Sequence, residues 1–156
     1  MDHSLFIKQY RDQNQLHIRE GNGKVISIYP LERWNSSMGE NWVILLFDLF
    51  QIRSVGGHFS EVALDIVDFA SKPTIYHTEP NRLLPSGLAD LKEIRFSLVR
   101  EPNWKKLLFQ ISQPIIAQIG VETKADVETK LNFPLLGPNV KELYLGAKGD
   151  VKIIKG

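Results

Sequence analysis

Four side chains that can bind a metal ion lie close together between residues 58 and 68. On a helix that begins near His58, the carboxylates of Glu61, Asp65 and Asp68 would lie along the same face as the imidazole. Imidazole together with carboxylates suits zinc, manganese or iron. An amphipathic helix, however, requires a polar face of this kind in any case. We therefore interpret these residues as a solvated acidic face, and we predict no metal site and no cofactor.

A second candidate chemistry is metal-dependent hydrolysis of nucleic acid. Nucleases of this kind pair an Asp with a later Glu-x-Lys, in which the carboxylates hold magnesium and the lysine helps to orient water. The pattern occurs at 122–124 and again at 128–130, with Asp65 or Asp90 upstream. It is common by chance, and it belongs on a strand, whereas 126–131 is predicted to be helical. A small metal-dependent nuclease or hydrolase is thus an alternative hypothesis.

The motifs of phosphate binding and of nucleophilic catalysis are missing from the sequence. The chain has no cysteine, and no Gly-x-Ser-x-Gly is present. The glycines at 21–23 lack a third glycine and a following helix, and Gly56-Gly57 lacks the lysine and hydroxyl residue of a phosphate-binding loop. His77 and Glu79 form only an isolated pair. We predict that the protein is not an enzyme and has no small-molecule substrate.

Basic side chains near a tryptophan form the best local signal. Two arginines lie within the segment 93–100, two lysines follow beside a tryptophan, and further lysines lie near residue 150. Such residues can bind phosphates, stack on a base, or lie at a lipid headgroup surface. The predicted nucleic-acid or membrane-binding residues are Arg95, Arg100, Trp104, Lys105, Lys106, Lys148, Lys152 and Lys155.

Length and composition predict one globular domain over residues 1–156. The net charge is only +1, which is far from the basic excess of a dedicated DNA-binding domain. We expect the N-terminal residues not to act as a signal peptide, and the longest uncharged apolar run is too short to span a bilayer. We expect a cytoplasmic or virion protein that is peripheral to the membrane.

Strand signals dominate the elements that must position these residues. Residues 15–30 are predicted to be a hairpin, residues 42–50 a buried central strand and residues 93–100 another strand. Residues 5–10 are a possible edge strand. Two short strands are expected at 140–145 and 151–155.

The remaining segments are ambiguous or are predicted to be loops and helices. Helical and strand spacing compete at 58–70, where Ser60 is a plausible N-cap and helix is slightly favoured. The same competition is open at 104–112. Residues 71–91 are predicted to be a long surface loop, and 115–131 to be mostly helical. The predicted fold class is β-rich, an antiparallel sheet or sandwich with a few short helices, either all-β or α+β.

One stretch carries a family resemblance. The segment FSLVREPNWKKLLFQI, followed by PLLGPNV, resembles the C-terminal part of the matrix proteins of bornaviruses and related negative-strand RNA viruses. The shared features are a strand, a charged turn with proline, an apolar segment and a downstream Gly137-Pro138. Gly57-His58, Ile66 and Asp68-Phe69 are similar to an earlier stretch of the same family.

The resemblance implies a sandwich-like domain that self-associates and attaches to the inner membrane leaflet and to viral RNA or nucleoprotein. Together with the basic residues, it leads to the hypothesis of a non-enzymatic, matrix-like assembly protein. The expected partners are a second copy of the chain and an anionic lipid surface or RNA. A plain protein-interaction module is a further alternative that the sequence does not separate from this one.

Overall fold

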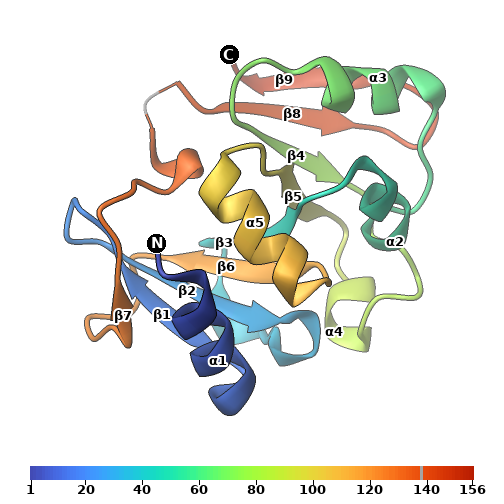
Figure 1. Cartoon of the computed structure of the whole chain (residues 1–156). Coiled ribbons are helices and arrows are strands. Elements are labelled where there is room, and N and C mark those ends of the chain that lie inside the picture. Colours follow the sequence, from blue (N-terminus) through green and yellow to red (C-terminus); the bar gives the residue numbers. More distant parts are fainter. Residues whose placement is uncertain (138) are drawn as a thin grey trace.

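The structure, a computed structural model, describes residues 1–137 and 139–156. The described chain forms a nine-stranded mixed sheet with helices packed on it (Figure 1). The α-helices are α1 (His3–Gln13), α2 (Ile52–Val55), α3 (Glu61–Phe69), α4 (Ser86–Ala89) and α5 (Pro102–Ile111). The strands are β1 (Leu16–Arg19), β2 (Val25–Pro30), β3 (Trp42–Leu46), β4 (Thr74–Thr78), β5 (Ile94–Leu98), β6 (Ile115–Ile119), β7 (Val127–Glu128), β8 (Lys141–Leu145) and β9 (Val151–Lys155). Short 3₁₀ helices lie at Leu31–Arg33, Ser36–Met38, Leu49–Gln51 and Pro134–Leu136.

The sheet has the strand order β7-β1-β2-β6-β3-β5-β4-β8-β9. Three neighbouring pairs run parallel, namely β1 with β7, β3 with β5, and β4 with β8. The remaining pairs are antiparallel. The prediction of a sheet-rich fold is confirmed, but an antiparallel sheet or sandwich is wrong, because the fold is α/β with one mixed sheet.

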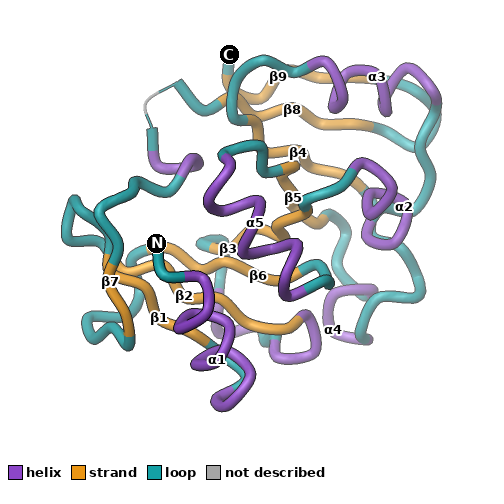
Figure 2. The backbone as a smooth tube through the Cα atoms, in the orientation of Figure 1, coloured by secondary structure: helices purple, strands orange, loops and turns teal. Residues whose placement is uncertain are grey.

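Alternating side chains of the central strands divide the core into two layers. In β3, Val43 and Leu45 face the cluster that contains the apolar residues of α1 and α5. Ile44 and Leu46 face the cluster built with α2, α3 and α4. Successive strand residues point to opposite faces, so a strand covered on both faces is apolar at every position. Figure 2 shows the helices distributed around the orange sheet.

The two ambiguous segments are helices. In α3 the Ser60 hydroxyl accepts a hydrogen bond from the backbone N–H of Ala63 at 3.1 Å, which confirms the favoured interpretation. In α5 the first residue is Pro102, whose missing N–H costs nothing in the first helical turn. The hairpin and the strands near 94, 141 and 151 also agree with the prediction.

Three other expectations were wrong. Residues 115–119 form β6 in the middle of the sheet, although 115–131 was predicted to be mostly helical. A strand buried on both faces has no alternation that would reveal it. The predicted loop 71–91 contains β4, and the possible strand at 5–10 lies within α1, which Asp2 caps at its N-terminus.

None of the helices in the described ranges combines the length and the apolar character that spanning a bilayer needs.

Candidate functional site

A cavity of about 370 Å³ lies where the end of α3, the strands β4 and β5, and the first residues of α5 meet. We call it the α5 pocket. Its volume falls at the lower end of the range typical of small-molecule sites. Its lining residues are Val67, Ala70, Ser71, Lys72, Pro73, Thr74, Tyr76, Ser97, Leu98, Val99, Arg100, Glu101, Pro134 and Leu135.

Arg100 lies at the edge of the α5 pocket and is held there by the end of α3. Its Nη2 donates hydrogen bonds to the backbone oxygens of Val67, at 2.9 Å, and Asp68. The last carbonyls of a helix lack partners within the helix and carry partial negative charge, so a guanidinium is favourable there. The contact fixes a permanent positive charge beside the cavity. Lys72, exposed in the loop after α3, contributes a second cation to the lining.

Glu101 caps the N-terminus of α5. Its Oε2 accepts from the backbone N–H of Trp104 at 2.7 Å, and its Oε1 accepts from the Asn103 side chain at 3.0 Å. Burial by itself would raise the pKa of Glu101, but these hydrogen bonds outweigh burial and lower that pKa. The carboxylate is therefore ionised at neutral pH and occupies the helix N-terminus. The Glu101 carboxylate already occupies the N-terminus of α5, so an anionic ligand in the pocket must be held by Arg100 and Lys72.

Two buried hydroxyls line the floor of the pocket. The Ser97 hydroxyl donates to the backbone oxygen of Thr74 at 2.7 Å, and the Thr74 hydroxyl donates to the backbone oxygen of Lys72 at 2.9 Å. Since each hydroxyl proton is committed to a carbonyl, the oxygen lone pairs are available as acceptors. The floor thus suits a ligand that brings N–H or O–H groups, such as an amino group or a sugar hydroxyl.

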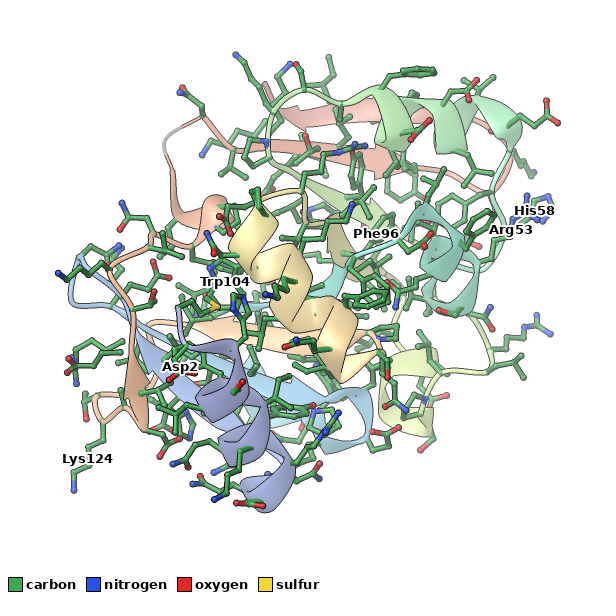
Figure 3. All side chains as sticks on the ribbon, in the orientation of Figure 1. Asp2, Arg53, His58, Phe96, Trp104 and Lys124 are labelled. Carbon is green, nitrogen blue, oxygen red and sulfur yellow. The ribbon has the colours of Figure 1, made fainter. Side chains whose placement is uncertain are left out.

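An aromatic wall closes one side of the pocket. Tyr76 lines it and stacks on Phe96, with ring centroids 5.2 Å apart. Phe96, which is labelled in Figure 3, is fully buried. Burial raises the pKa of the Tyr76 phenol, so it remains a neutral hydrogen-bonding group at physiological pH. Apolar walls, acceptors on the floor and cations at the edge together fit an amphiphilic ligand with an anionic end.

The residues predicted for nucleic-acid or membrane binding do not form one surface. Trp104, which Figure 3 labels on α5, is completely buried. Its ring packs edge-on against that of Phe133, with centroids 4.9 Å apart. Its ring therefore offers no face to a base or a lipid. Lys105 and Lys106 are exposed on α5 and do not line the α5 pocket.

The other basic residues are distributed over distant parts of the sheet. Arg95 lies over the ring of Trp42 in a second cavity, whereas Arg100 lines the α5 pocket. Lys148 lies in the turn between β8 and β9, and Lys152 and Lys155 are exposed on β9 at the edge of the sheet. The fold therefore does not bring all eight residues together on one surface. A binding role for the individual lysines stays a prediction.

The acidic residues considered for metal chemistry are also separated. Within residues 1–137 and 139–156, no group of three or more metal-ligating side chains is close enough to hold an ion. His58 precedes α3 and lies on the outside, as does Lys124 at the other end of the molecule (Figure 3). Glu128 lies on the short strand β7.

Sequence reasoning missed Lys72, Thr74 and Ser97. They lie in segments interpreted as a loop and as an ordinary strand, and they carry no motif. The signal that could have found them is the pairing of β4 with β5, which brings Thr74 and Ser97 together. Only the tertiary arrangement of the strands makes that pairing visible.

The comparisons with known proteins bear on the fold. No protein-family model and no curated protein matches the sequence. The structure is similar to E. coli YciO, with a TM-score of 0.70, 12% identity, and coverage of 99% of this chain and 89% of YciO. It is similar to full-length HypF in its phosphate- and nucleotide-bound form, with a TM-score of 0.68 and 16% identity over 98% of this chain and 28% of HypF. It is also similar to P. abyssi Sua5 complexed with L-threonine, with a TM-score of 0.65 and 10% identity over 91% of this chain and 49% of Sua5.

These similarities identify the fold as the YrdC-like fold of Sua5, YciO and HypF. The resemblance to bornaviral matrix proteins is therefore wrong. A strand, a turn with proline and an apolar helix recur in many folds, which explains how so short a match arose.

The functional expectations built on that resemblance are wrong as well. A non-enzymatic matrix-like assembly protein, with RNA, lipid or a second copy as partner, is contradicted by a fold whose solved examples hold small molecules. The prediction of a protein without enzymatic activity and without a small-molecule substrate is contradicted too, by the same likeness to HypF in its nucleotide-bound form and to Sua5 with L-threonine.

Proposed function

We propose that this domain binds a nucleotide in the α5 pocket. The observation that carries the proposal is the position of Arg100 and Lys72 at the edge of a largely apolar cavity with buried hydroxyl acceptors. Phosphate oxygens would contact the two cations. The sugar or base would lie against the apolar walls, with its N–H and O–H groups toward Thr74 and Ser97.

The fold supports the same assignment. HypF, which has this fold, was solved in a phosphate- and nucleotide-bound form. Since the chain corresponds to only 28% of HypF and 49% of Sua5, the activities of those whole proteins come to this chain as proposals. We infer an enzymatic step in which a nucleotide activates a small molecule. Cations beside the phosphates stabilise the charge that develops during such a transfer.

Calorimetric titration with ATP tests the proposal. We expect binding by the wild-type protein, and a loss of affinity of about tenfold or more in Arg100→Gln and in Lys72→Gln. The matched control is the double variant Lys105→Gln, Lys106→Gln, which removes two exposed lysines of α5 outside the pocket. Unchanged affinity in Lys72→Gln and Arg100→Gln, with a loss in the α5 double variant, would place the nucleotide elsewhere.

A turnover assay extends the test to the enzymatic step. Release of phosphate or pyrophosphate from ATP should depend on an added small-molecule acceptor, and L-threonine is the first one to try because it was bound to Sua5. Binding without release under any acceptor would limit the function to nucleotide binding.

A further inference from the structure

A second cavity of about 610 Å³ lies at the opposite end of β4 and β5 from the α5 pocket. It shares no lining residue with that pocket. Two tryptophans, Trp34 and Trp42, line it together with an arginine, a histidine and three glutamates. We call it the Trp34–Trp42 pocket.

The arginine of this pocket has donors without acceptors. The Arg95 guanidinium lies 5.1 Å from the centre of the Trp42 ring and is half-buried. Among the described residues, no hydrogen bond and no ion pair to its side chain is found. A guanidinium carries five N–H donors, and those of Arg95 are not among the buried atoms without a partner, so they remain accessible. Since Arg95 lines the cavity, a ligand there can supply acceptors that the chain does not.

The carboxylates of the pocket lie near Arg95 without contacting it. Burial lowers the pKa of Arg95, and the charges of Glu40, Glu142 and Glu93 oppose that effect. In the part of the chain that the structure describes, none of the three comes within the 4.0 Å that defines an ion pair with Arg95. Donors and acceptors thus face the same cavity with a gap between them.

Two further polar atoms of the pocket lack a partner. The indole Nε1–H of Trp34 is buried and makes no hydrogen bond, whereas that of Trp42 donates to the backbone oxygen of Gly39 at 2.9 Å. His77 Nε2 lies 3.4 Å from Glu142 Oε2 but forms no hydrogen bond. The indole rings of Trp34 and Trp42 meet edge-on, with centroids 5.9 Å apart, and add flat apolar surface.

We propose that the Trp34–Trp42 pocket is a binding site for a neutral nucleobase of the guanine type. Guanine carries two acceptors, O6 and N7, that match an arginine fork, and its neighbouring N–H groups are donors for carboxylates. A ligand of this kind bridges Arg95 and the glutamates, and its ring stacks on aromatic surface. The unpartnered Trp34 N–H supplies a further donor to the ring.

The net negative charge of the lining side chains disfavours an anionic ligand in this pocket. The three glutamates outnumber the single arginine, so phosphate or a free carboxylate would be repelled. A short zwitterion such as threonine satisfies the polar groups but leaves the indole surface uncovered. A base without phosphate satisfies both, which makes this site independent of the nucleotide proposed for the α5 pocket.

Calorimetry with guanosine, adenosine and L-threonine tests the ligand class on the full chain. We expect guanosine to bind, and adenosine, which has a donor where guanine has O6, to bind at least about tenfold more weakly. No guanosine binding by folded protein at millimolar concentration overturns the proposal. Equal binding of adenosine, or L-threonine binding that displaces guanosine, overturns the assignment to guanine.

Variants locate the binding. Arg95→Gln should weaken guanosine binding by about tenfold or more and leave ATP affinity at the α5 pocket unchanged. Arg53→Gln is the matched control, because Arg53 is exposed on α2 and lines neither cavity (Figure 3). Guanosine affinity that is the same in Arg95→Gln and wild type contradicts the site, and a loss in Arg100→Gln instead would assign guanosine to the α5 pocket.

A spectroscopic readout does not depend on those variants. The chain has three tryptophans and therefore three indole N–H resonances. Guanosine should shift the Trp34 indole N–H resonance, assigned by Trp34→Phe, and leave that of fully buried Trp104 in place. A titration that moves none of the three resonances contradicts the proposal.

Discussion

The side chain of Glu20 accepts a hydrogen bond from the backbone N–H of Phe133, although 113 residues separate them in the sequence. The contact ties the hairpin of β1 and β2 to the segment that carries Pro134 and Leu135 of the α5 pocket. Glu20 is only 3% exposed, and its Oε1 has no hydrogen-bond partner among the described residues. Burial raises its pKa from 4.5 to about 7, against the opposing effect of the Phe133 hydrogen bond.

This raised pKa predicts a pH-dependent stability. Between about pH 4.5 and pH 7 the folded state binds the proton and the unfolded state releases it, so the free energy of unfolding falls as pH rises through that window. The loss amounts to roughly 3 kcal/mol. Denaturant unfolding at a series of pH values measures it.

Glu20→Gln is the control for that effect. The amide oxygen of the glutamine can still accept a hydrogen bond from the Phe133 N–H, but the side chain no longer ionises. The decrease in the free energy of unfolding between about pH 4.5 and pH 7 should therefore disappear. A wild-type and a Glu20→Gln protein with parallel pH profiles would show that Glu20 does not carry the dependence.

Replacement of Trp104 by alanine should destabilise the fold severely. The side chain is fully buried against Phe133, and truncation of such an aromatic costs about 3 to 5 kcal/mol. Phe109→Ala on the same helix is the comparison, because Phe109 is 66% exposed and should cost much less. Equal destabilisation by the two variants in thermal unfolding would contradict the packing described for α5.

Arg100→Ala should affect both stability and affinity. Loss of its hydrogen bonds to the end of α3 should cost about 1 kcal/mol, since the arginine is partly solvated. Lys72→Ala should lower ATP affinity without that loss of stability. Chemical denaturation measures the stability of the two variants, and titration with ATP measures their affinity. An Arg100→Ala protein as stable as wild type would show that Arg100 does not stabilise the end of α3.

Salt should weaken ATP binding to the α5 pocket. Arg100 and Lys72 lie at the exposed edge of the cavity, where ions screen their attraction for phosphate. Guanosine carries no charge, so its affinity for the Trp34–Trp42 pocket should change far less over the same salt series. Titrations in low and high salt compare the two, and salt-independent ATP binding would argue against a phosphate contact with these cations.

Much of the local structure was predictable from the sequence. Alternation identifies β1 and β5, and the glycine-containing turn at 21–23 marks the hairpin that β1 forms with β2. Ser60 marks the start of α3 because a hydroxyl at that position satisfies a free helix N–H. The central strand β6 was missed because both of its faces are buried, which erases alternation.

The candidate site was only partly visible. Arg100 was singled out as basic, but its position depends on the end of α3, more than thirty residues away. The sequence places Trp104 among the binding residues of a surface, and only the packing of α5 shows that its side chain belongs to the core. Parallel pairing of β3 with β5 and of β4 with β8 is a long-range property that no local pattern carries.

A crystal structure of the protein grown with ATP would show where the nucleotide binds. We expect the phosphates to lie beside Arg100 and Lys72, and the rest of the nucleotide to fill the α5 pocket between β4 and the N-terminus of α5. Phosphates bound elsewhere on the sheet, with the α5 pocket empty, would contradict this expectation.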